Sequence, residues 1–478
     1  MAERVEHFST RWGMLVAMLG MAVGTGNIWR FPRVAATNGG GSYLVAWAVF
    51  LLLWSVPLIL IEFGMGRATR YGNEGAFARI MGRRYAWMGA WVAWTATAIM
   101  FYYAIVAGWT IRFSLAALTG ELRRGEPGAL WESFAWSPTV VIYQALALGL
   151  GVFIVARGVR GIEYATRLLI PSLFVLVVVL AVRAVTLPGA GAGLEFLFTP
   201  SWDGLKNPDV WIAALTQNAW DTGAGWGLIL TYALYMRRRE DTSLNAFVIG
   251  FGNNTISLLA GIMVLCTVFS IMPDASAQIV GAGNEGLTFI WVPQLFARMP
   301  GGSIFMVLFF VALFFAAISS LIAMIELATR VLADMGISRG RAIAVVGGAG
   351  FVLGVPSALN QSVFGNQDFV WGVGLMVSGL FFATAVLRYG VTRFRESFVN
   401  TPDSDIRIGA WWDWAIRFVV VQAFVLIGWW FYYAIGQEAW GPEGWANMAA
   451  QWALALAFFI AINGWMVRMT RPEVDRDV

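Results

Sequence analysis

Cysteine and histidine are almost missing from this chain of 478 residues, which has one of each, Cys266 and His7. A single thiol cannot form a disulfide within the chain, and a single imidazole cannot build a histidine metal site or a proton relay. The sequence also has no His-Glu-x-x-His segment and no comparable cluster of nucleophiles and acids. We therefore do not expect an enzyme.

Charged residues are scarce as well, at 13% of the chain, whereas 59% of residues are hydrophobic. Apolar runs of about 20 residues, the length that crosses a hydrocarbon core, recur with only short polar connections between them. No cleavage site of small residues follows the first run, so we expect that span to be retained. This composition predicts an integral membrane protein whose main partner is the lipid bilayer.

About twelve apolar runs are long enough to be transmembrane spans. Those of the first half lie near residues 13–36, 43–65, 85–118, 140–156, 168–185 and 210–234. Those of the second half lie near residues 244–272, 303–332, 342–355, 370–387, 414–435 and 445–466.

The basic residues indicate the orientation of these spans. With a cytoplasmic N-terminus, about 24 of the 32 basic residues fall in inner connections or at the termini, as the positive-inside rule requires. The net charge of +4 is spread between spans and not along one face, so we do not expect nucleic-acid binding. We expect a multi-pass protein of a prokaryotic inner membrane, with both termini in the cytoplasm.

The first and sixth spans are each interrupted by glycine and polar residues, at Gly24-Thr25-Gly26 and from Asp221 to Gly225. An unwound backbone is tolerated at membrane depth only where it is buried in protein or lines a cavity. Paired breaks in two halves are typical of inverted-repeat secondary transporters. Glycines that only allow close helix packing are the alternative, but packing does not require Asn27 and Asp221 beside the breaks.

The residues at the first break resemble a known family. The run from Gly20 to Pro32, followed by Asn38-Gly39-Gly40-Gly41, resembles the first span of the neurotransmitter:sodium symporter family. The resemblance extends through the segment 62–67, the Tyr102-Tyr103 pair, Thr231-Tyr232-Ala233 and Ser319-Ser320.

This resemblance implies an all-α polytopic membrane protein with the LeuT-like fold. The fold has about 12 transmembrane helices, of which ten form two inverted repeats of five spans with broken helices 1 and 6. The repeats would occupy residues 1–185 and 186–390, and spans 11 and 12 would occupy residues 391–478.

The resemblance also implies two sodium sites. The first would use the Ala22 carbonyl, the side chains of Asn27 and Asn253, and Asp221, at a position where the family usually has Thr or Ser. The second would use the carbonyls of Gly20, Val23 and Ala316 with the hydroxyls of Ser319 and Ser320.

Asp221 is a departure from the family pattern. Some relatives bind chloride beside the first sodium and others have a carboxylate in span seven, where this chain has Ser257. We hypothesise that Asp221 supplies the fixed negative charge, so that no chloride is needed. Alternatively, Asp221 binds and releases a proton during transport, or only caps the second half of span six.

The substrate is expected between the two breaks. The resemblance implies a pocket formed by Met21, Ala22, Thr25, Gly26, Ile99, Tyr103, Trp220, Asp221, Gly223, Trp226, Ser320 and Met324. Monoamine carriers have Asp at the position of Gly24, so its absence favours an amino acid.

Trp226 should make the pocket small, whereas Gly223 adds volume. A substrate such as glycine or alanine is favoured, and a larger neutral amino acid or another small carboxylate or amino compound is the alternative.

Gate residues follow from the same resemblance. Arg30 and Asp368 would form the outer pair, with Tyr103 and Trp220 as the lid. The inner gate would use Tyr235 and Asp334 with Arg4, because the usual Arg is replaced by Val5 and the usual Trp by Phe8. Glu326 replaces an amide and is either a proton site or the partner of an inner arginine. A channel and a non-transporting amino-acid sensor remain as alternatives to a carrier.

Overall fold

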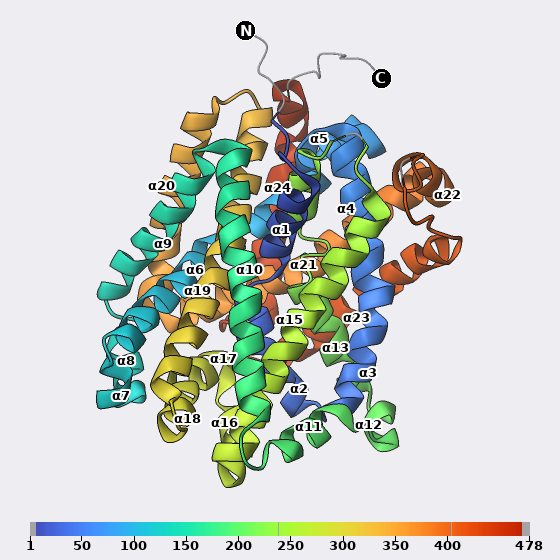
Figure 1. The fold of residues 1–478 in the computed structure, drawn as a ribbon. Helices are drawn as coiled ribbons and strands as arrows, with labels where there is room; N and C mark the ends of the chain where they lie inside the picture. Colours follow the sequence, from blue (N-terminus) through green and yellow to red (C-terminus); the bar gives the residue numbers. More distant parts are fainter. Residues whose placement is uncertain (1–5, 238, 403, 471–478) are drawn as a thin grey trace.

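The computed structural model describes residues 6–237, 239–402 and 404–470, and this part of the chain is helical with no strand (Figure 1). Nine segments are long and apolar enough to cross a membrane. They are α3–η2–α4 (Gly41–Thr69), η3–α6 (Arg83–Leu118), α10 (Gly158–Val185), α15 (Thr242–Ile271), α19 (Gly302–Asp334), α20 (Arg339–Leu359), α21 (Gln361–Tyr389), α23 (Trp411–Ile435) and α24 (Trp445–Met469).

The remaining spans are bent or broken. Helix α1 (Arg11–Ala22) continues into η1–α2 (Gly26–Thr37) after a bend of 56°, and α8 (Pro127–Phe134) meets α9 (Thr139–Val155) at 85°. The sixth span consists of α13 (Pro208–Asp221) and α14 (Leu228–Ala233), each too short to cross alone. Together these segments account for the twelve predicted spans, whereas the repeat borders at residues 185 and 390 stay a prediction.

Short helices connect the spans. They are α5 (Asn73–Met81), α7 (Glu121–Arg124), α11 (Ala190–Phe198), α12 (Trp202–Lys206), η4 (Pro273–Ala275), α16 (Ser276–Gly281), α17 (Gly283–Glu285), η5 (Gly286–Trp291), α18 (Val292–Arg298), α22 (Val391–Phe394) and η6 (Arg395–Val399). Helix α1 begins and α24 ends on the same side of the bundle (Figure 1), as an even number of spans requires.

Side-chain caps begin several of these helices where the sequence supplies Thr, Asp or Asn. The Thr10 hydroxyl accepts a hydrogen bond from Gly13 N at the start of α1, and Asp241 accepts from two backbone amides at the start of α15. Asn360 caps α21 in the same way. Each cap satisfies backbone donors that the first helical turn leaves free.

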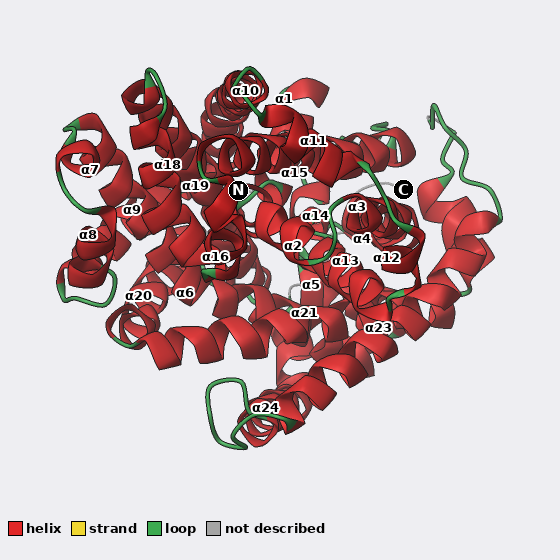
Figure 2. Ribbon diagram, turned by 90° about the horizontal axis from the view of Figure 1, so that it is seen from below, coloured by secondary structure: helices red, strands yellow, loops and turns green. Residues whose placement is uncertain are grey.

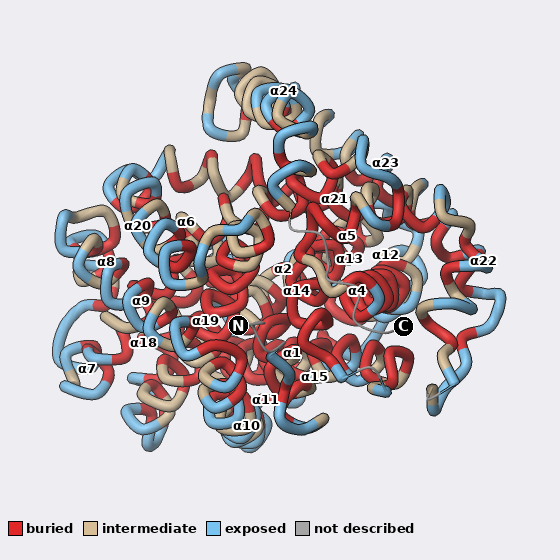
Figure 3. The backbone as a smooth tube through the Cα atoms, turned by 90° about the horizontal axis from the view of Figure 1, so that it is seen from above, coloured by how far each residue is buried: buried red, intermediate tan, exposed pale blue. Residues whose placement is uncertain are grey.

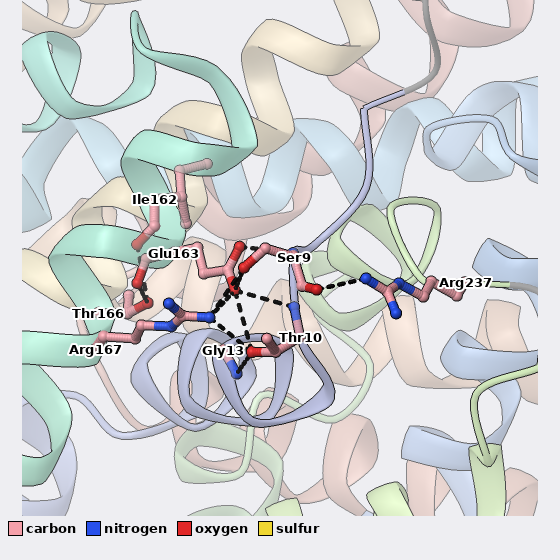
Figure 4. A network of polar contacts seen from close by, with 8 residues as sticks. All are labelled: Ser9, Thr10, Gly13, Ile162, Glu163, Thr166, Arg167 and Arg237. Carbon is pink, nitrogen blue, oxygen red and sulfur yellow. Dashed lines mark hydrogen bonds and ion pairs between the residues drawn. The ribbon is translucent and has the colours of Figure 1, made fainter.

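The fifth span starts earlier than the hydropathy predicts, because α10 begins at Gly158 and not near residue 168. The extra turns carry charges that find partners on the N-terminal segment (Figure 4). Glu163 is buried, accepts from Ser9 Oγ at 2.6 Å and pairs with Arg167 at 2.5 Å. Charges that are neutralised in this way extend a helix that a hydropathy window would end.

The centre of the bundle is formed by α1, α4, α14 and α19, whereas α24 and the α7–α8 corner lie at its edges (Figures 2 and 3). Large apolar side chains on the outer helices are exposed, such as Leu454 at 73% and Phe424 at 61%. Lipid is the natural solvent for such a surface. Cys266 on α15 is fully buried beside α11, where a Cβ on Gly193 would lie 2.8 Å from Cys266 Cα.

Candidate functional site

The first break leaves backbone groups that side chains satisfy. After α1 ends at Ala22, the amide of Gly24 donates to Asn27 Oδ1 at 2.8 Å, and the amide of Thr25 donates to the Tyr103 hydroxyl at 3.1 Å. Tyr103 lies on α6, so the unwound segment is tied to a neighbouring span. These contacts give the break one defined shape at membrane depth.

The second break spans residues 222–227 and depends on glycine. Gly223, Gly225 and Gly227 have φ of +69°, +86° and +78°, a backbone region that other residues rarely adopt. The buried carboxylate of Glu62 on α4 accepts from Gly225 N at 2.7 Å and from Leu230 N at 3.1 Å. Glu62 therefore satisfies the start of the second half-helix.

A chain of buried polar groups joins the two breaks. Asn27 Nδ2 donates to Ser257 Oγ at 2.7 Å, and the Ser257 hydroxyl donates to Asp221 Oδ2 at 2.9 Å. All three side chains are at most 5% exposed. The carboxylate of Asp221 thus contacts Ser257 of span seven directly. The sequence analysis linked these two positions, and the structure adds the hydrogen bond between them.

One terminal atom of the Asn253 carboxamide lies 3.0 Å from the backbone carbonyl oxygen of Asp221 and 3.2 Å from that of Ala22. If this terminal atom is the oxygen, it also accepts from Asn27 Nδ2 at 2.9 Å. The Asn253 side-chain oxygen and the two carbonyl oxygens then lie close together, as the ligands of a hard cation do. With its nitrogen on that side, the amide donates to both carbonyls. The two orientations differ by a half-turn of the amide, and sodium requires the first.

The predicted second sodium site is also brought together. The Ser320 hydroxyl lies 3.3 Å from the Val23 carbonyl and 3.4 Å from that of Met21, and the Ser319 hydroxyl donates to the Ala316 carbonyl at 3.0 Å. Helices α1 and α19 meet here so closely that a Cβ on Gly20 would lie 3.3 Å from Ser319 Cβ.

Both groups consist of carbonyl, amide, hydroxyl and carboxylate oxygens, a donor set that suits a hard cation such as Na⁺. The described residues hold no group of three or more His, Cys, Asp and Glu that would suit a transition metal. When bound, Na⁺ would supply positive charge beside the two breaks.

A cavity of about 640 Å³ lies at the two breaks and is lined by all twelve residues predicted for the substrate pocket. It extends to Tyr433, near the end of α23, and to Glu443, just before the start of α24. Helix α24 ends on the side where α1 begins (Figure 1), so the cavity extends toward the other side of the bundle. Val106, Leu228 and Val373 also line it, and the sequence analysis missed them because isolated apolar residues carry no distinguishing signal.

The predicted outer gate is not closed in this structure. Arg30 and Asp368 both line the cavity, but among the described ion pairs none joins them. The Arg30 guanidinium instead lies 4.7 Å from the ring centre of Trp220, a cation–π contact. The pairing of Arg30 with Asp368 stays a prediction for a closed state.

The opposite side is closed by packing around Tyr235. Phe8 is 3% exposed, donates its amide to the Tyr235 carbonyl at 3.2 Å, and packs edge-on against Tyr232 and Tyr235. Asp334 pairs with Arg330 of its own helix at 2.7 Å and accepts from Gly72 N at 2.6 Å. Arg4, the predicted partner at this gate, lies outside the described residues.

Glu326 has an arginine partner, one of the two roles considered for it. Arg339, at the start of α20, reaches both carboxylate oxygens at 3.0 and 2.6 Å, and the Tyr235 hydroxyl donates to Glu326 at 2.5 Å. Glu326 is fully buried. The arginine was not identified from the sequence, because it lies on the next helix and not at the N-terminus.

The sequence profile of the Sodium:neurotransmitter symporter family matches residues 5–137 and 135–471. The chain belongs to this family. An uncharacterized sodium-dependent transporter of Methanocaldococcus jannaschii is 29% identical over 431 residues, covering 86% of this chain and 87% of that protein. The uncharacterized sodium-dependent transporter YhdH of Bacillus subtilis is 27% identical, covering 89% and 97%.

The fold comparison agrees with the sequence comparison. The crystal structure of MhsT in complex with L-phenylalanine matches with a TM-score of 0.78 and 29% identity, covering 88% of this chain and 98% of MhsT. The predicted family and LeuT-like fold are therefore confirmed. The chain is a multi-pass, sodium-dependent membrane transporter of this symporter family and not an enzyme.

Proposed function

We propose that this protein is a sodium-coupled symporter for a neutral amino acid, with a preference for small ones, and that it works without chloride. The observation that carries the proposal is the placement of the cavity floor between two oxygen-rich clusters, one of them holding Asp221. A positive charge in such a cluster favours a carboxylate beside it, so ion and substrate would bind together.

The two ends of an amino acid have matching groups on the cavity floor. The Tyr103 hydroxyl suits a carboxylate, because it accepts from Thr25 N and keeps its own proton to donate, and the Gly26 amide stands beside it at the start of η1. The Ser320 hydroxyl and nearby carbonyls suit an ammonium group. At Gly24 a Cβ would lie 3.0 Å from Ser320 Oγ and 3.1 Å from the Tyr103 hydroxyl, so a larger residue would occupy this space.

Pocket size favours a small side chain. Trp226 is 7% exposed and packs edge-on against Trp220, with ring centres 6.2 Å apart, so two indoles fill one wall. Gly223 lies against Met21, where a Cβ would be 3.2 Å from the Met21 sulfur. A larger neutral amino acid is the second candidate, because the structure of MhsT contains L-phenylalanine.

Chloride independence is proposed from Asp221. Its carboxylate accepts a hydrogen bond from the Ser257 hydroxyl inside the bundle, so a fixed negative charge stands beside the first predicted sodium site. A buried anion compensates a buried cation, which is the role that an exchangeable chloride would otherwise fill.

We further propose a prokaryotic plasma membrane location with both termini in the cytoplasm. The distribution of arginines supports this orientation, and the open cavity would then face outward.

Uptake into proteoliposomes tests the proposal. With an inward sodium gradient and gluconate in place of chloride, we expect accumulation of labelled alanine or glycine, and competition by these two over phenylalanine and leucine. Uptake that needs chloride would contradict the role of Asp221, and preferential uptake of phenylalanine would contradict the size preference. Binding without accumulation in sealed vesicles would indicate a sensor.

A further inference from the structure

A second cavity lies on the outside of the bundle, between α9 and α20. It has a volume of about 340 Å³ and is lined by apolar residues, including Leu148, Gly149 and Val152 of α9 and Gly347, Gly348 and Phe351 of α20. On α9 the lining positions 145, 148, 149 and 152, and on α20 the positions 344, 347, 348 and 351, follow the i, i+3, i+4, i+7 pattern of one helix face. We call this cavity the α9–α20 groove.

The groove is hollow because glycines stand on both walls. A Cβ on Gly149 or on Gly348 would have no atom within 4 Å, whereas a Cβ on Gly347 would lie 2.9 Å from Val152 Cγ2. Val152 and Gly347 therefore form the floor where the helices touch. Leu146, at 54% exposure, and Val352, at 64%, flank the groove on the outer surface.

The groove lies within the hydrocarbon region. From Ala145 to Val152 it runs along α9 for about 10 Å, at 1.5 Å per residue. Both helices are spans, so the available occupant at this depth is hydrocarbon and not water. A groove of this shape and length accommodates part of a methylene chain.

Arginines stand close in sequence to the ends of the two groove helices, on the side where α1 begins. Arg157 and Arg160 follow the end of α9, and Arg341 lies two residues before Ile343 of the groove lining. All three are exposed. The Arg157 guanidinium lies 3.9 Å from the ring centre of Phe153, itself 53% exposed, so this cation rests against the membrane-facing surface.

The two helix ends are held together at this point. Arg339 donates to the Val155 carbonyl at 3.0 Å and pairs with Glu326, so it is not available to a ligand. Of the nearby acids, Glu326 pairs with Arg339 and Glu163 with Arg167, whereas the Glu6 carboxylate accepts from Val159 N at 2.8 Å. Three exposed arginines against one carboxylate leave a positive patch at the level of the lipid headgroups.

We propose that the α9–α20 groove is a binding site for an anionic phospholipid of the leaflet on the side of the termini. One acyl chain occupies the groove, and the phosphate binds Arg157, Arg160 and Arg341. The apolar groove and the cationic rim are separate observations that point to the two parts of one amphipathic ligand. The site is separate from the transport cavity, so it does not depend on the proposed substrate.

Native mass spectrometry of the purified full-length protein tests the site, with dioleoyl phosphatidylglycerol and dioleoyl phosphatidylcholine as probes. We expect the wild type to retain phosphatidylglycerol at least about tenfold more strongly than phosphatidylcholine. Gly348→Leu should abolish retention of both lipids by filling the groove. Gly464→Leu on α24, another position where a Cβ has no neighbour within 4 Å, should not.

The charged rim is tested separately. Arg157→Gln with Arg341→Gln should remove the preference for phosphatidylglycerol while phosphatidylcholine is still retained. The matched control is Arg123→Gln with Arg298→Gln, two exposed arginines at the other end of the bundle. Equal retention of both lipids by the wild type would overturn the proposal. So would equal lipid retention in the two leucine variants, or a dimer that only Gly348→Leu dissociates, because a second copy would then cover the groove.

Discussion

At the scale of single residues, the proposed independence from chloride rests on Asp221. The carboxylate is bonded to Ser257 at 2.9 Å, and both side chains are buried. Among the described residues no other acidic side chain is hydrogen-bonded to this group, so the role of the charge can be tested by moving the carboxylate from position 221 to position 257.

We predict that Asp221→Ser abolishes chloride-independent uptake, because the predicted sodium site would lose its compensating charge. The double variant Asp221→Ser with Ser257→Glu should restore it, since the charge returns one hydrogen-bond length away. Uptake is measured with chloride and with gluconate. Full chloride-independent uptake by the single variant would rule out this role for Asp221.

Tyr103→Phe should weaken substrate binding. The hydroxyl accepts from Thr25 N at 3.1 Å, so its own proton is free for the substrate carboxylate in the proposed function, and its loss leaves that carboxylate without a donor. Such a loss costs about 1–3 kcal/mol, or roughly 5- to 150-fold in affinity. The control is Tyr43→Phe, because the buried Tyr43 hydroxyl has no hydrogen-bond partner among the described residues and Tyr43 does not line the cavity. Equal affinities for the two variants, measured by titration, would contradict the prediction.

The lining of the cavity could be anticipated at this scale, because the residues at the breaks are unusual for a membrane span. The contacts of individual side chains could not. Whether Arg30 pairs with Asp368 or lies on Trp220 depends on the packing around both, which a motif does not encode.

At the scale of elements, the second half of the sixth span depends on one carboxylate. Glu62 accepts hydrogen bonds from two amides that no helical carbonyl reaches, those of Gly225 and Leu230. Helix α14 is only six residues long and would not be stable alone.

We predict that Glu62→Gln lowers the apparent melting temperature, because an amide has one acceptor oxygen where the carboxylate has two. The loss should be about 1–3 kcal/mol, the cost of one buried unpaired donor. Glu195→Gln, on the exposed face of α11, should change stability by less than about 0.5 kcal/mol. Melting curves of the two variants in the same detergent give the comparison, and identical curves would count against the role of Glu62.

Hydropathy located the spans well, since the twelve predicted ranges overlap the observed helices. It erred where charge is locally neutralised, as at the start of α10 around Glu163. It also could not foresee the π-helical turns, such as η1 at Gly26–Arg30 and η2 at Leu51–Ser55. These depend on how neighbouring spans hold the backbone.

At the scale of the whole molecule, the cavity is open on one side of the bundle and closed on the other. The closed side relies on Phe8 and on the network of Glu326, Arg339 and Tyr235. This network joins the turn after α14 to α19 and α20, so it connects the second half of the broken span to the scaffold.

We predict that Glu326→Gln and Arg339→Gln each destabilise the closed side by a few kcal/mol, since each leaves a partly or fully buried charge unpaired. The double variant should be less unstable than the sum of the two, as groups in contact are not additive. The exposed pair Lys206 and Asp203 is the control and should contribute almost nothing. Additive melting shifts for Glu326 and Arg339 would contradict the coupling.

The sequence identified the family and the number of spans, because both depend on local composition and on one long motif. It did not identify which side of the molecule is open. That state depends on contacts between segments far apart in the chain, such as Phe8 with Tyr235.

The burial of Cys266 has a practical consequence for experiments that follow the opening and closing of the two sides of the bundle. Since this is the only thiol in the sequence and it is fully buried beside α11, the natural chain already serves as an unreactive background for site-directed labelling. Pairs of cysteines introduced on either side of the bundle would carry spin labels or fluorophores without further substitution. The opening and closing of each face could then be timed in the otherwise unaltered transporter.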